Sequence, residues 1–325
     1  MPSLYFDANS VLAHLDYPGC IEAVRDAMAS FTASAKDQPL RTAIEIEPGK
    51  LLGLMPGFLP SGERFGAKIL SVFEDQNRPG RSSHRGSIVL FNTTDGTIDC
   101  IADAEQITLI RTAAASAVAT DALARASAQR LAIFGCGAQA RSHILAIQHV
   151  RPLSEIIVWG RNKKITDNFV EKMRAETDLL IRSEVDARAA AANADIICTV
   201  TGAQTPILLG QWVRPGTHVN VVGSSHPGPV EVDDALVVAS RFVVDSRRSA
   251  LSAAAEFLKA KAAGLIDEGH IVAEIGEVLL GRVAGRTGRD DITLYKSLGH
   301  IVQDLAAVSY VKTRVRLAKI ASARA

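Results

Sequence analysis

Short apolar runs alternate with helical stretches from about residue 129 to about residue 246. The runs are apolar throughout instead of alternating with polar residues, which indicates strands that are buried on both faces. The stretches between them have the length and the Ala, Leu, Lys and Glu content of crossover helices. The pattern therefore predicts a doubly wound parallel sheet covered by helices. The predicted strands are 131–134, 155–159, 195–200, 217–222 and 241–245, and the predicted helices are 137–150, 163–176 and 186–194.

The first 100 residues have a different pattern, in which the turn sequences PG, PSG, RPG and TDG break the chain into short segments. Such segments are typical of an antiparallel sheet, and an early helix is predicted at about 18–32. Two longer helical patterns span about 103–127 and about 297–319. The apolar residues on one side of the second pattern are Ile301, Leu305, Val308, Val311 and Val315.

The sequence LAIFGCGAQARSHI at residues 131–144 joins a predicted strand to a predicted helix through two glycines. This order matches the GxGxxA form of the dinucleotide fingerprint. Gly135 permits the tight turn, Gly137 lets the backbone approach a pyrophosphate, and Ala140 keeps the helix close to the sheet. The helix N-terminus offers unpaired N–H groups to the phosphates. The residues assigned to this turn of a Rossmann-type domain, which binds NAD(P)(H), are Gly135, Gly137, Ala138, Gln139 and Ala140.

The end of the second predicted strand bears on the choice between NAD and NADP. An NAD site favours an acidic residue there that binds the ribose hydroxyls, and this sequence has none. Arg161 and Lys163 offer cations to a 2′-phosphate instead, so the sequence leans toward NADP and leaves NAD open. Their charges could equally be those of a solvated loop. Further cofactor contacts are predicted at Arg161, Asn162, Thr199, Val200, Thr201, Gly223, Ser224, Ser297 and Gly299.

The two patterns predict a chain of two domains. Residues 119–297 form the dinucleotide-binding α/β domain. Residues 1–118 form a discontinuous α+β domain, which is completed by 298–325 because we expect the C-terminal helix to return to it.

Composition and charge exclude several classes of partner. With 47% hydrophobic residues, 22% charged residues and a net charge of +1, the 325-residue chain is typical of a soluble globular protein. Basic residues are scattered and aromatic residues few, so no nucleic-acid partner is expected. No signal sequence and no membrane-length apolar run is evident, so we expect a cytoplasmic protein without a membrane partner. The four cysteines lack metal-ligand spacing, so we expect reduced thiols and no metal.

Seven stretches of the sequence resemble the ornithine cyclodeaminase and mu-crystallin family, and the resemblance covers nearly the whole chain. It implies a homodimer, a first domain that binds substrate, mediates dimerisation and is completed by the C-terminal helix, and a nicotinamide cofactor that faces a small amino or imino acid. The stretches are GAKILSVFEDQ (66–76), SSHRGSIVLFN (82–92), ITLIRTAAASAVAT (107–120), FGCGAQARSH (134–143), GQWVRPGTHVNVVGSS (210–225), AEIGEVLLG (273–281) and YKSLGHIVQDLAA (295–307).

A 2-amino or 2-imino acid carries a carboxylate, and a site for it needs fixed cations such as the planar Arg fork and Lys. Arg41, Lys68 and Arg111 match the positions at which the family holds that carboxylate. Lys68 and Arg111 stand among apolar or small neighbours, where an unpaired cation is costly to bury. A substrate carboxylate would relieve that cost, and Lys68 becomes a candidate proton donor if burial lowers its pKa. Taken alone, each residue could be a surface charge.

The stretch VVGSSHPGPVEVDD departs from the cyclodeaminases of the family. Those enzymes resemble it but carry an Asp where this chain has Ser225, whereas mu-crystallin, which reduces cyclic ketimines, has a Ser. A serine hydroxyl can bond an imine or hold a water, but it cannot act as a carboxylate base. The resemblance therefore favours imine reduction or amino-acid dehydrogenation over ring closure with loss of ammonia. Alternatively, Ser225 only caps the turn before Pro227.

Other basic residues bear on the substrate. If Arg85 and His226 both face inward, the site holds more positive charge than one carboxylate requires, which favours a dicarboxylic imine such as iminosuccinate. Each could also point outward. His300 lies where the family packs against the nicotinamide region, as either a core histidine or a residue behind the site. His143 and His149 lack a metal-ligand pattern and are expected on helix surfaces.

The sequence thus predicts an NAD(P)H-dependent reductase that adds hydride to the C=N carbon of a small 2-imino acid and gives an L-amino acid. A cyclic ketimine such as pyrroline-2-carboxylate is the other substrate considered. Three alternatives stay open: an ornithine cyclodeaminase-type lyase, an alanine-type dehydrogenase, and a non-catalytic NADP-binding protein. The predicted catalytic and substrate-binding residues are Arg41, Lys68, Arg85, Arg111, Ser225 and His226.

Overall fold

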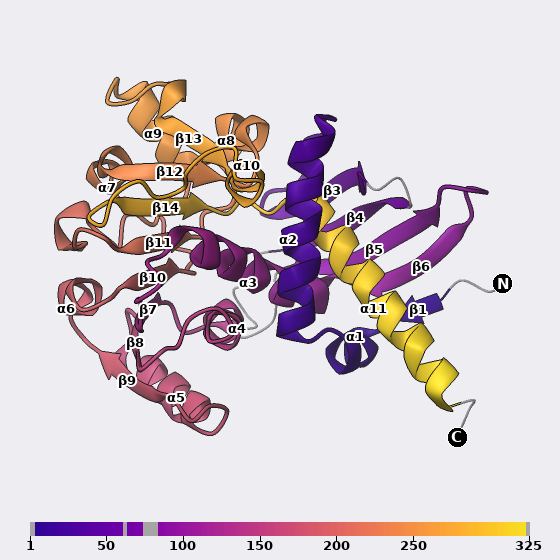
Figure 1. Cartoon of the computed structure of the whole chain (residues 1–325), viewed down its shortest axis with the longest axis horizontal. Helices are drawn as coiled ribbons and strands as arrows, with labels where there is room; N and C mark the ends of the chain where they lie inside the picture. Colours follow the sequence, from indigo (N-terminus) through magenta and orange to yellow (C-terminus); the bar gives the residue numbers. More distant parts are fainter. Residues whose placement is uncertain (1–3, 61–63, 74–83, 323–325) are drawn as a thin grey trace. The chain divides into compact units, whose positions relative to one another are not determined.

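The structure is a computed structural model that describes residues 4–60, 64–73 and 84–322. The chain forms two compact units (Figure 1). The first consists of Met1–Arg111 with His300–Ala325, and the second is Thr112–Gly299. One boundary lies within helix α3 (Ala104–Leu123), and the other directly precedes helix α11 (Ile301–Ser322). The C-terminal helix therefore belongs to the unit that the N-terminal residues form.

The first unit is a six-stranded sheet with helices on one face. Its other elements are β1 (Leu4–Phe6), α1 (Ala8–His14), α2 (Tyr17–Ser34), β2 (Thr42–Glu47), β3 (Lys50–Phe58), β4 (Arg64–Phe73), β5 (His84–Asn92) and β6 (Ile98–Asp103). The strand order is β1-β6-β5-β4-β3-β2, antiparallel except between β1 and β6. Helix α11 contacts α2 and strands β3, β4 and β5, and Figure 1 shows the two helices side by side. A Cβ atom at Gly57 would lie 2.5 Å from Cγ2 of Ile301, so this glycine lets α11 approach the sheet.

The second unit is a doubly wound sheet of eight strands in which every neighbouring pair is parallel. Its strands are β7 (Arg130–Phe134), β8 (Glu155–Trp159), β9 (Leu180–Glu184), β10 (Ile196–Thr199), β11 (His218–Val221), β12 (Ser240–Val244), β13 (Ile271–Glu274) and β14 (Ile292–Lys296). The order is β13-β12-β14-β11-β10-β7-β8-β9, so the winding reverses between β7 and β10. Open α/β sheets bind ligands at the carboxyl ends of the strands beside such a reversal.

Helices of the second unit cover this sheet. They are α4 (Ala138–Ile147), α5 (Lys163–Arg174), α6 (Ala187–Ala192), α7 (Asp234–Ala239), α8 (Arg247–Ala253), α9 (Ala255–Ala262) and α10 (Ile275–Leu279). Phe134, Phe242 and Leu294 are fully buried in the core of this unit, as expected for strands of a parallel sheet that helices cover. Within the described ranges, no helix combines the length and the apolar composition needed to cross a membrane.

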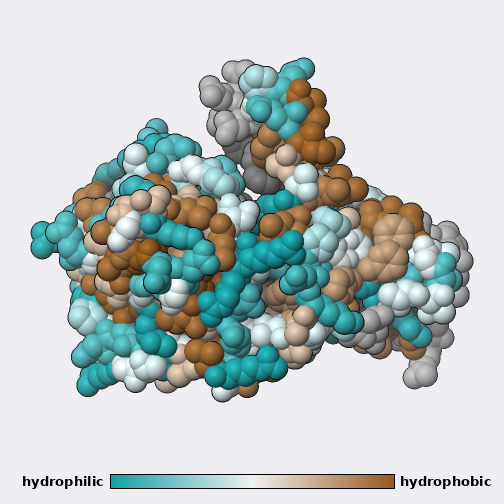
Figure 2. All heavy atoms as spheres, turned by 90° about the horizontal axis from the view of Figure 1, so that it is seen from above, coloured by the Kyte–Doolittle hydropathy of each residue, from teal (hydrophilic) through white to brown (hydrophobic). Residues whose placement is uncertain are grey.

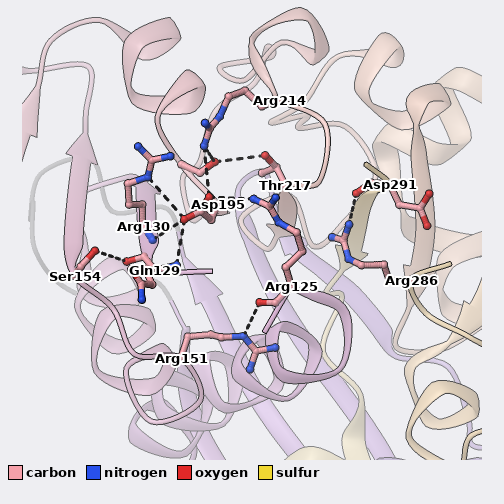
Figure 3. A network of polar contacts seen from close by, with 11 residues as sticks. Arg125, Gln129, Arg130, Arg151, Ser154, Asp195, Arg214, Thr217, Arg286 and Asp291 are labelled. Atoms are coloured by element: carbon pink, nitrogen blue, oxygen red, sulfur yellow. Dashed lines mark hydrogen bonds and ion pairs between the residues drawn. The ribbon is translucent and has the colours of Figure 1, made fainter. Parts of the chain in front are cut away.

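Arginines hold the amino-terminal edge of this sheet together (Figure 3). Asp195, directly before β10, accepts hydrogen bonds from the backbone N–H groups of Gln129 and Arg130 at 3.1 and 3.0 Å. Arg125, Arg214 and Arg130 also form ion pairs with its carboxylate at 3.1, 3.5 and 3.7 Å. These contacts fix β7 beside β10 at the edge opposite the carboxyl ends of the strands.

Candidate cofactor turn and carboxylate-binding cluster

The turn between β7 and α4 has the shape that a dinucleotide requires. Gly135 has a φ of +135°, and a Cβ atom there would lie 2.9 Å from the carbonyl oxygen of Val200, so the position needs glycine. Gly137 is the N-cap of α4, no side chain caps this helix end, and a Cβ atom at Gly137 would meet nothing within 4 Å. A pyrophosphate can therefore approach the first N–H groups of the helix. Ala140 is fully buried, as close packing of α4 on the sheet requires.

The residues that follow the turn correct one sequence expectation. Ala138 is exposed, whereas Oε1 of Gln139 is buried without a hydrogen-bond partner in the described part of the chain. The prediction that His143 lies on the helix surface is wrong. Its Nδ1 donates to the carbonyl oxygen of Gln139 at 2.8 Å, and its Nε2 lies 3.0 Å from the hydroxyl of Ser116. Burial lowers its pKa to about 4, so His143 is a neutral link between α3 and α4, whereas His149 is exposed.

The residues after β8 lie beside the glycine turn because β8 pairs with β7. Arg161 is exposed there, and no acidic residue directly follows the strand. Lys163 is also exposed, but its Nζ lies 2.5 Å from Oδ2 of Asp167. The side chain of Asn162 accepts a hydrogen bond from a backbone N–H and caps α5. Arg161 is therefore the better placed of the two predicted cations for a 2′-phosphate.

One buried carboxylate joins the loops that follow β10 and β11. Oε2 of Glu231 accepts hydrogen bonds from the hydroxyl of Thr199 at 2.9 Å and from the N–H of Gly223 at 2.7 Å. Oε1 accepts from the N–H and the hydroxyl of Thr201, at 2.7 and 2.8 Å. Burial raises the pKa of Glu231 against the effect of these hydrogen bonds. Three residues predicted to contact the cofactor are thus brought together at the carboxyl edge of the sheet.

A second buried network anchors the loop that carries Ser225. The hydroxyl of Ser224 donates to Glu256, and Nζ of Lys296 donates to the carbonyl and hydroxyl oxygens of Ser224 at 2.6 Å each. Lys296 also pairs with Oε2 of Glu256 at 2.7 Å. All three side chains are buried, whereas Ser225 is half-buried and His226 is exposed. The loop is therefore fixed at Ser224, and the next two residues lie nearer the surface.

The last predicted cofactor residues lie in the segment that follows β14. Oδ2 of Asp245 accepts hydrogen bonds from the N–H groups of Leu298 and Gly299 at 2.9 and 2.7 Å. Gly299 has a φ of +81°, which favours glycine. The N–H of Ser297 donates to the carbonyl oxygen of Val221 at 3.0 Å. Its hydroxyl is buried and has no hydrogen-bond partner among the residues described.

Two of the three predicted carboxylate-binding cations meet in the first unit. Lys68 on β4 and Arg111 on α3 each donate to Oδ1 of Asp304 on α11, at 2.9 Å in both cases. The hydroxyl of Thr108 lies 3.2 Å from Nζ of Lys68, and Oε1 of Gln303 accepts from Nη1 of Arg111 at 2.9 Å. Lys68, Arg111 and Asp304 are 1%, 4% and 0% exposed, so three charges share a buried site.

Electrostatic effects connect Arg41 and His300 to this cluster. Burial lowers the pKa of Lys68 to about 8, Asp304 opposes the change, and the charges of Arg111 and Arg41 add to it. Burial also lowers the pKa of His300 to about 4, so this ring is neutral near pH 7. Arg41, which is half-buried directly before β2, thus acts on the same site as the two buried cations.

The structure does not bring Arg85 into this cluster. Lys68 pairs with Ile88 in the β4–β5 ladder, and Ser71 pairs with Arg85. Because successive side chains of a strand alternate between faces, positions 68 and 71 face opposite sides of the sheet. The exposed Arg85 therefore lies on the face opposite α11.

Asp304, Gln303 and Glu231 are the main site residues that the sequence reasoning missed. The sequence did contain a sign that Asp304 is buried, because this residue falls on the apolar side of the C-terminal helix, between Ile301 and Val308. A carboxylate on a buried helix face needs a cationic partner, and Lys68 and Arg111 were already candidates. Nothing in the local sequence distinguishes Glu231 from a surface loop residue.

The doubly wound sheet with its glycine turn defines a dinucleotide-dependent oxidoreductase, and the first unit of the chain buries cations suited to an acidic substrate. The chain belongs to the ornithine cyclodeaminase/mu-crystallin family, whose model matches residues 5–319.

Relatives include both curated proteins and solved structures. Ketimine reductase mu-crystallin of Macropus fuliginosus is 34% identical over 312 residues, which cover 94% of this chain and 93% of that protein. Delta(1)-pyrroline-2-carboxylate reductase of Thermococcus litoralis, in complex with NADH and L-proline, has a TM-score of 0.93 at 31% identity and covers 97% of this chain and 98% of that one. The iminosuccinate reductase of Paracoccus denitrificans, in complex with NAD+, has a TM-score of 0.90 at 26% identity and 98% coverage of both chains.

Proposed function

We propose that this chain is an NAD(P)H-dependent reductase that converts a small 2-imino acid into the corresponding L-amino acid. The buried charge of the first unit carries the proposal. Lys68 and Arg111 contribute two positive charges against the single negative charge of Asp304, and Arg41 acts on the same site. A buried excess of positive charge is unfavourable unless an anion compensates it. The carboxylate of a 2-imino acid is such an anion, and a guanidinium can bind it through two hydrogen bonds.

The residues of the chain have distinct tasks in this reaction. Arg111 and Arg41 bind the substrate carboxylate and fix its orientation. Lys68 donates a proton to the imine nitrogen, and NAD(P)H supplies the hydride for the carbon when it is bound. The π bond of the imine is lost, and one C–H and one N–H bond form. The hydroxyl of Ser225 bonds the nitrogen or a water, and His226 adds a polar contact from the same loop.

The nature of Ser225 supports reduction over a cyclising lyase. A lyase that expels ammonia needs a base for the amine, and a hydroxyl cannot serve as a carboxylate base. The presence of the buried cations argues against a non-catalytic nucleotide-binding protein, because such a protein has no use for them. An alanine-type dehydrogenase belongs to the same reaction class and would differ in the size of the substrate that it accepts.

A monocarboxylic cyclic ketimine such as pyrroline-2-carboxylate is the substrate that we favour. The cation assigned to a second carboxylate, Arg85, lies on the opposite face of the sheet from Lys68. His226, the other candidate for that role, is exposed. The similarity to a pyrroline-2-carboxylate reductase supports this choice, whereas the similarity to an iminosuccinate reductase keeps the dicarboxylic imine as the substrate to test against it.

Turnover of a panel of imines tests the proposal. Pyrroline-2-carboxylate, pyruvate with ammonia or methylamine, and oxaloacetate with ammonia are each supplied with NADH and with NADPH, and loss of the reduced cofactor is measured. We expect reduction of pyrroline-2-carboxylate to give the highest kcat/KM, and no release of ammonia from ornithine. Ammonia released from ornithine without an added cofactor would identify a lyase, and cofactor binding without turnover of any imine would identify a binding protein.

The cofactor specificity that we propose leans toward NADP, with NAD also accepted. Arg161 is exposed beside the glycine turn, where a cation can bind a 2′-phosphate. The solved relatives that contain NADH and NAD+ support a nicotinamide cofactor in general. The same imine panel decides between the two cofactors.

We also propose a cytoplasmic location. Cys20, Cys100 and Cys198 are buried free thiols, and Cys136 is a half-buried one. Free thiols persist where the surroundings are reducing.

We propose that a second copy of this chain binds the outer face of the first unit. The outer face is the face of its sheet that bears Phe65, Ile69 and Phe73. These side chains are 39%, 42% and 46% exposed, and Leu52 and Ile44 continue the face on β3 and β2. Figure 2 shows that hydrophobic residues gather in patches on the visible surface of the molecule. Exposed apolar side chains that gather on one face of a sheet are typical of a protein interface, which supports a homodimer.

Ile69→Lys is expected to convert the homodimer into a monomer that is still folded. The new charge would be buried without a partner in a dimer, whereas in a single chain the position is 42% exposed and tolerates it. Light scattering after size-exclusion chromatography measures the mass, and a thermal melt measures the fold. The control is Ile165→Lys, at a position on α5 that is 57% exposed in the other unit. A dimer that persists in the Ile69 variant would contradict the proposed interface.

A further inference from the structure

The carboxylate of Asp304 is bound to the cations of the candidate site and not to the scaffold around it. Its Oδ1 accepts hydrogen bonds from Lys68 and Arg111, each at 2.9 Å. Its Oδ2 is buried and has no hydrogen-bond partner among the described residues. A carboxylate with a purely structural role would be expected to accept hydrogen bonds from backbone N–H groups or helix ends, as Glu231 and Asp245 do in the second unit.

Three elements that are distant in sequence meet at this carboxylate. Lys68 comes from β4, Arg111 from α3 and Asp304 from α11, and all three side chains are almost completely buried. The two cations share one oxygen atom, which fixes the ammonium and the guanidinium side by side. Two like charges held this close repel each other unless a negative charge lies between them.

We propose that Asp304 is a positioning residue, which holds Lys68 and Arg111 in place and keeps Lys68 protonated as the proton donor. This inference rests on the proposed imine reduction. The protons balance as follows. Lys68 gives a proton to the imine nitrogen as hydride reaches the carbon. The neutral amino group of Lys68 then regains a proton from water. Without the charge of Asp304, a buried ammonium beside two guanidinium groups would lose its proton more readily.

The groups that act on Lys68 come from α3, α11 and the segment directly before β2, while its neighbours across the sheet, Met55 and Ile88, carry no charge. Arg111 and Arg41 disfavour the ammonium, Asp304 favours it, and the Thr108 hydroxyl is a neutral neighbour. The pKa of Lys68 is lowered to about 8, chiefly by burial, and Asp304 is the group that opposes this change through its charge and its hydrogen bond. Burial raises the pKa of Asp304, but the charges of Arg111 and Lys68 outweigh it and lower the pKa overall.

Two further titratable groups near Arg111 and Asp304 are neutral near pH 7. His300 has a pKa of about 4 because of its burial. Burial raises the pKa of the Cys20 thiol on α2 well above its usual range, so this group is also uncharged. Asp304 is therefore the acidic group that counters the cations around Lys68 in the described structure.

The pH profile of kcat/KM for imine reduction tests the inference in Asp304→Asn. Because Lys68 must be protonated, activity falls as the pH rises through the pKa of Lys68. Removal of the negative charge lowers that pKa, so the basic limb of the profile should move to lower pH by about one unit or more. Thr108→Val is the control, since it removes a hydrogen bond to Lys68 but no charge and should leave the limb in place.

Asp304→Glu extends the test if the Asn variant does not accumulate as folded protein. It retains the charge on a longer side chain, so the basic limb should stay near its wild-type position while KM for the imine rises. A basic limb that is unchanged in Asp304→Asn, or that moves in Asp304→Glu or Thr108→Val as far as it does in Asp304→Asn, would overturn the role of Asp304. If the wild-type protein binds NAD(P)H but reduces no imine, the proposed function fails instead, so the two failures are distinct.

Discussion

Arg111→Gln is expected to lower kcat/KM for the imine about 100-fold while the protein remains folded. The guanidinium is 4% exposed and is one of two buried cations beside Asp304, so its loss removes the planar group that binds the substrate carboxylate. A 100-fold loss corresponds to about 2.8 kcal/mol, within the range for a hydrogen bond to a charged group in a buried site. Glutamine retains hydrogen-bonding capacity, and Lys68 still pairs with Asp304 in this variant.

Steady-state kinetics with the preferred imine measure this effect, and quenching of NAD(P)H fluorescence checks that the second unit still binds its cofactor. Arg188→Gln is the matched control, because it removes the same charge from an exposed position on α6. Wild-type activity in Arg111→Gln would contradict the assignment of the carboxylate-binding site. A loss of cofactor binding in parallel would show that the substitution disturbs more than this site.

Gly137→Asp is expected to weaken cofactor binding by about 100-fold or more without any loss of stability. The new side chain has room, because a Cβ atom at this position meets nothing within 4 Å. As the N-cap of α4, the aspartate would accept hydrogen bonds from the first N–H groups of the helix, which changes stability by only a few tenths of a kcal/mol. The same carboxylate would occupy those N–H groups and repel the pyrophosphate.

Cofactor titrations and thermal melts of the same preparations separate the two effects. Gly137→Ala adds a Cβ atom without a charge and should weaken binding much less than the aspartate does. If Gly137→Asp binds NAD(P)H as the wild-type protein does, the N-terminus of α4 does not hold the phosphates. An unfolded variant would contradict the open position of this glycine.

The strands of the second unit were predictable where both of their faces are buried. The apolar run at 155–159 became β8 with the same bounds, and 131–134 differs from β7 by one residue. Strand β9, with the sequence LIRSE, was missed because it lies at the edge of the sheet and has only two apolar residues, which three polar residues follow. Strand β13 was missed because it has only four residues, and β14 was missed because Thr293 interrupts its apolar residues and Lys296 follows them.

The candidate site was only partly predictable, because its geometry depends on long-range pairing. Lys68 and Arg111 were found because they match the positions at which the family holds a carboxylate, and their apolar neighbours supported that match, since a buried cation needs a partner. The position of Arg85 depends on its register with β4, which a single strand sequence does not reveal. Asp304 was missed because the pattern of its helix was judged by apolar residues alone.

The anchoring of Ser224 has a consequence for how such a protein can change its chemistry over evolution. Glu256 and Lys296 hold the loop at Ser224, so this anchor is made by the residue before Ser225 and not by Ser225 itself. If Ser225 selects the reaction as proposed above, a single substitution there would change the chemistry while this anchor stays in place. The same lineage can thus acquire divergent activities without first having to rebuild the loop.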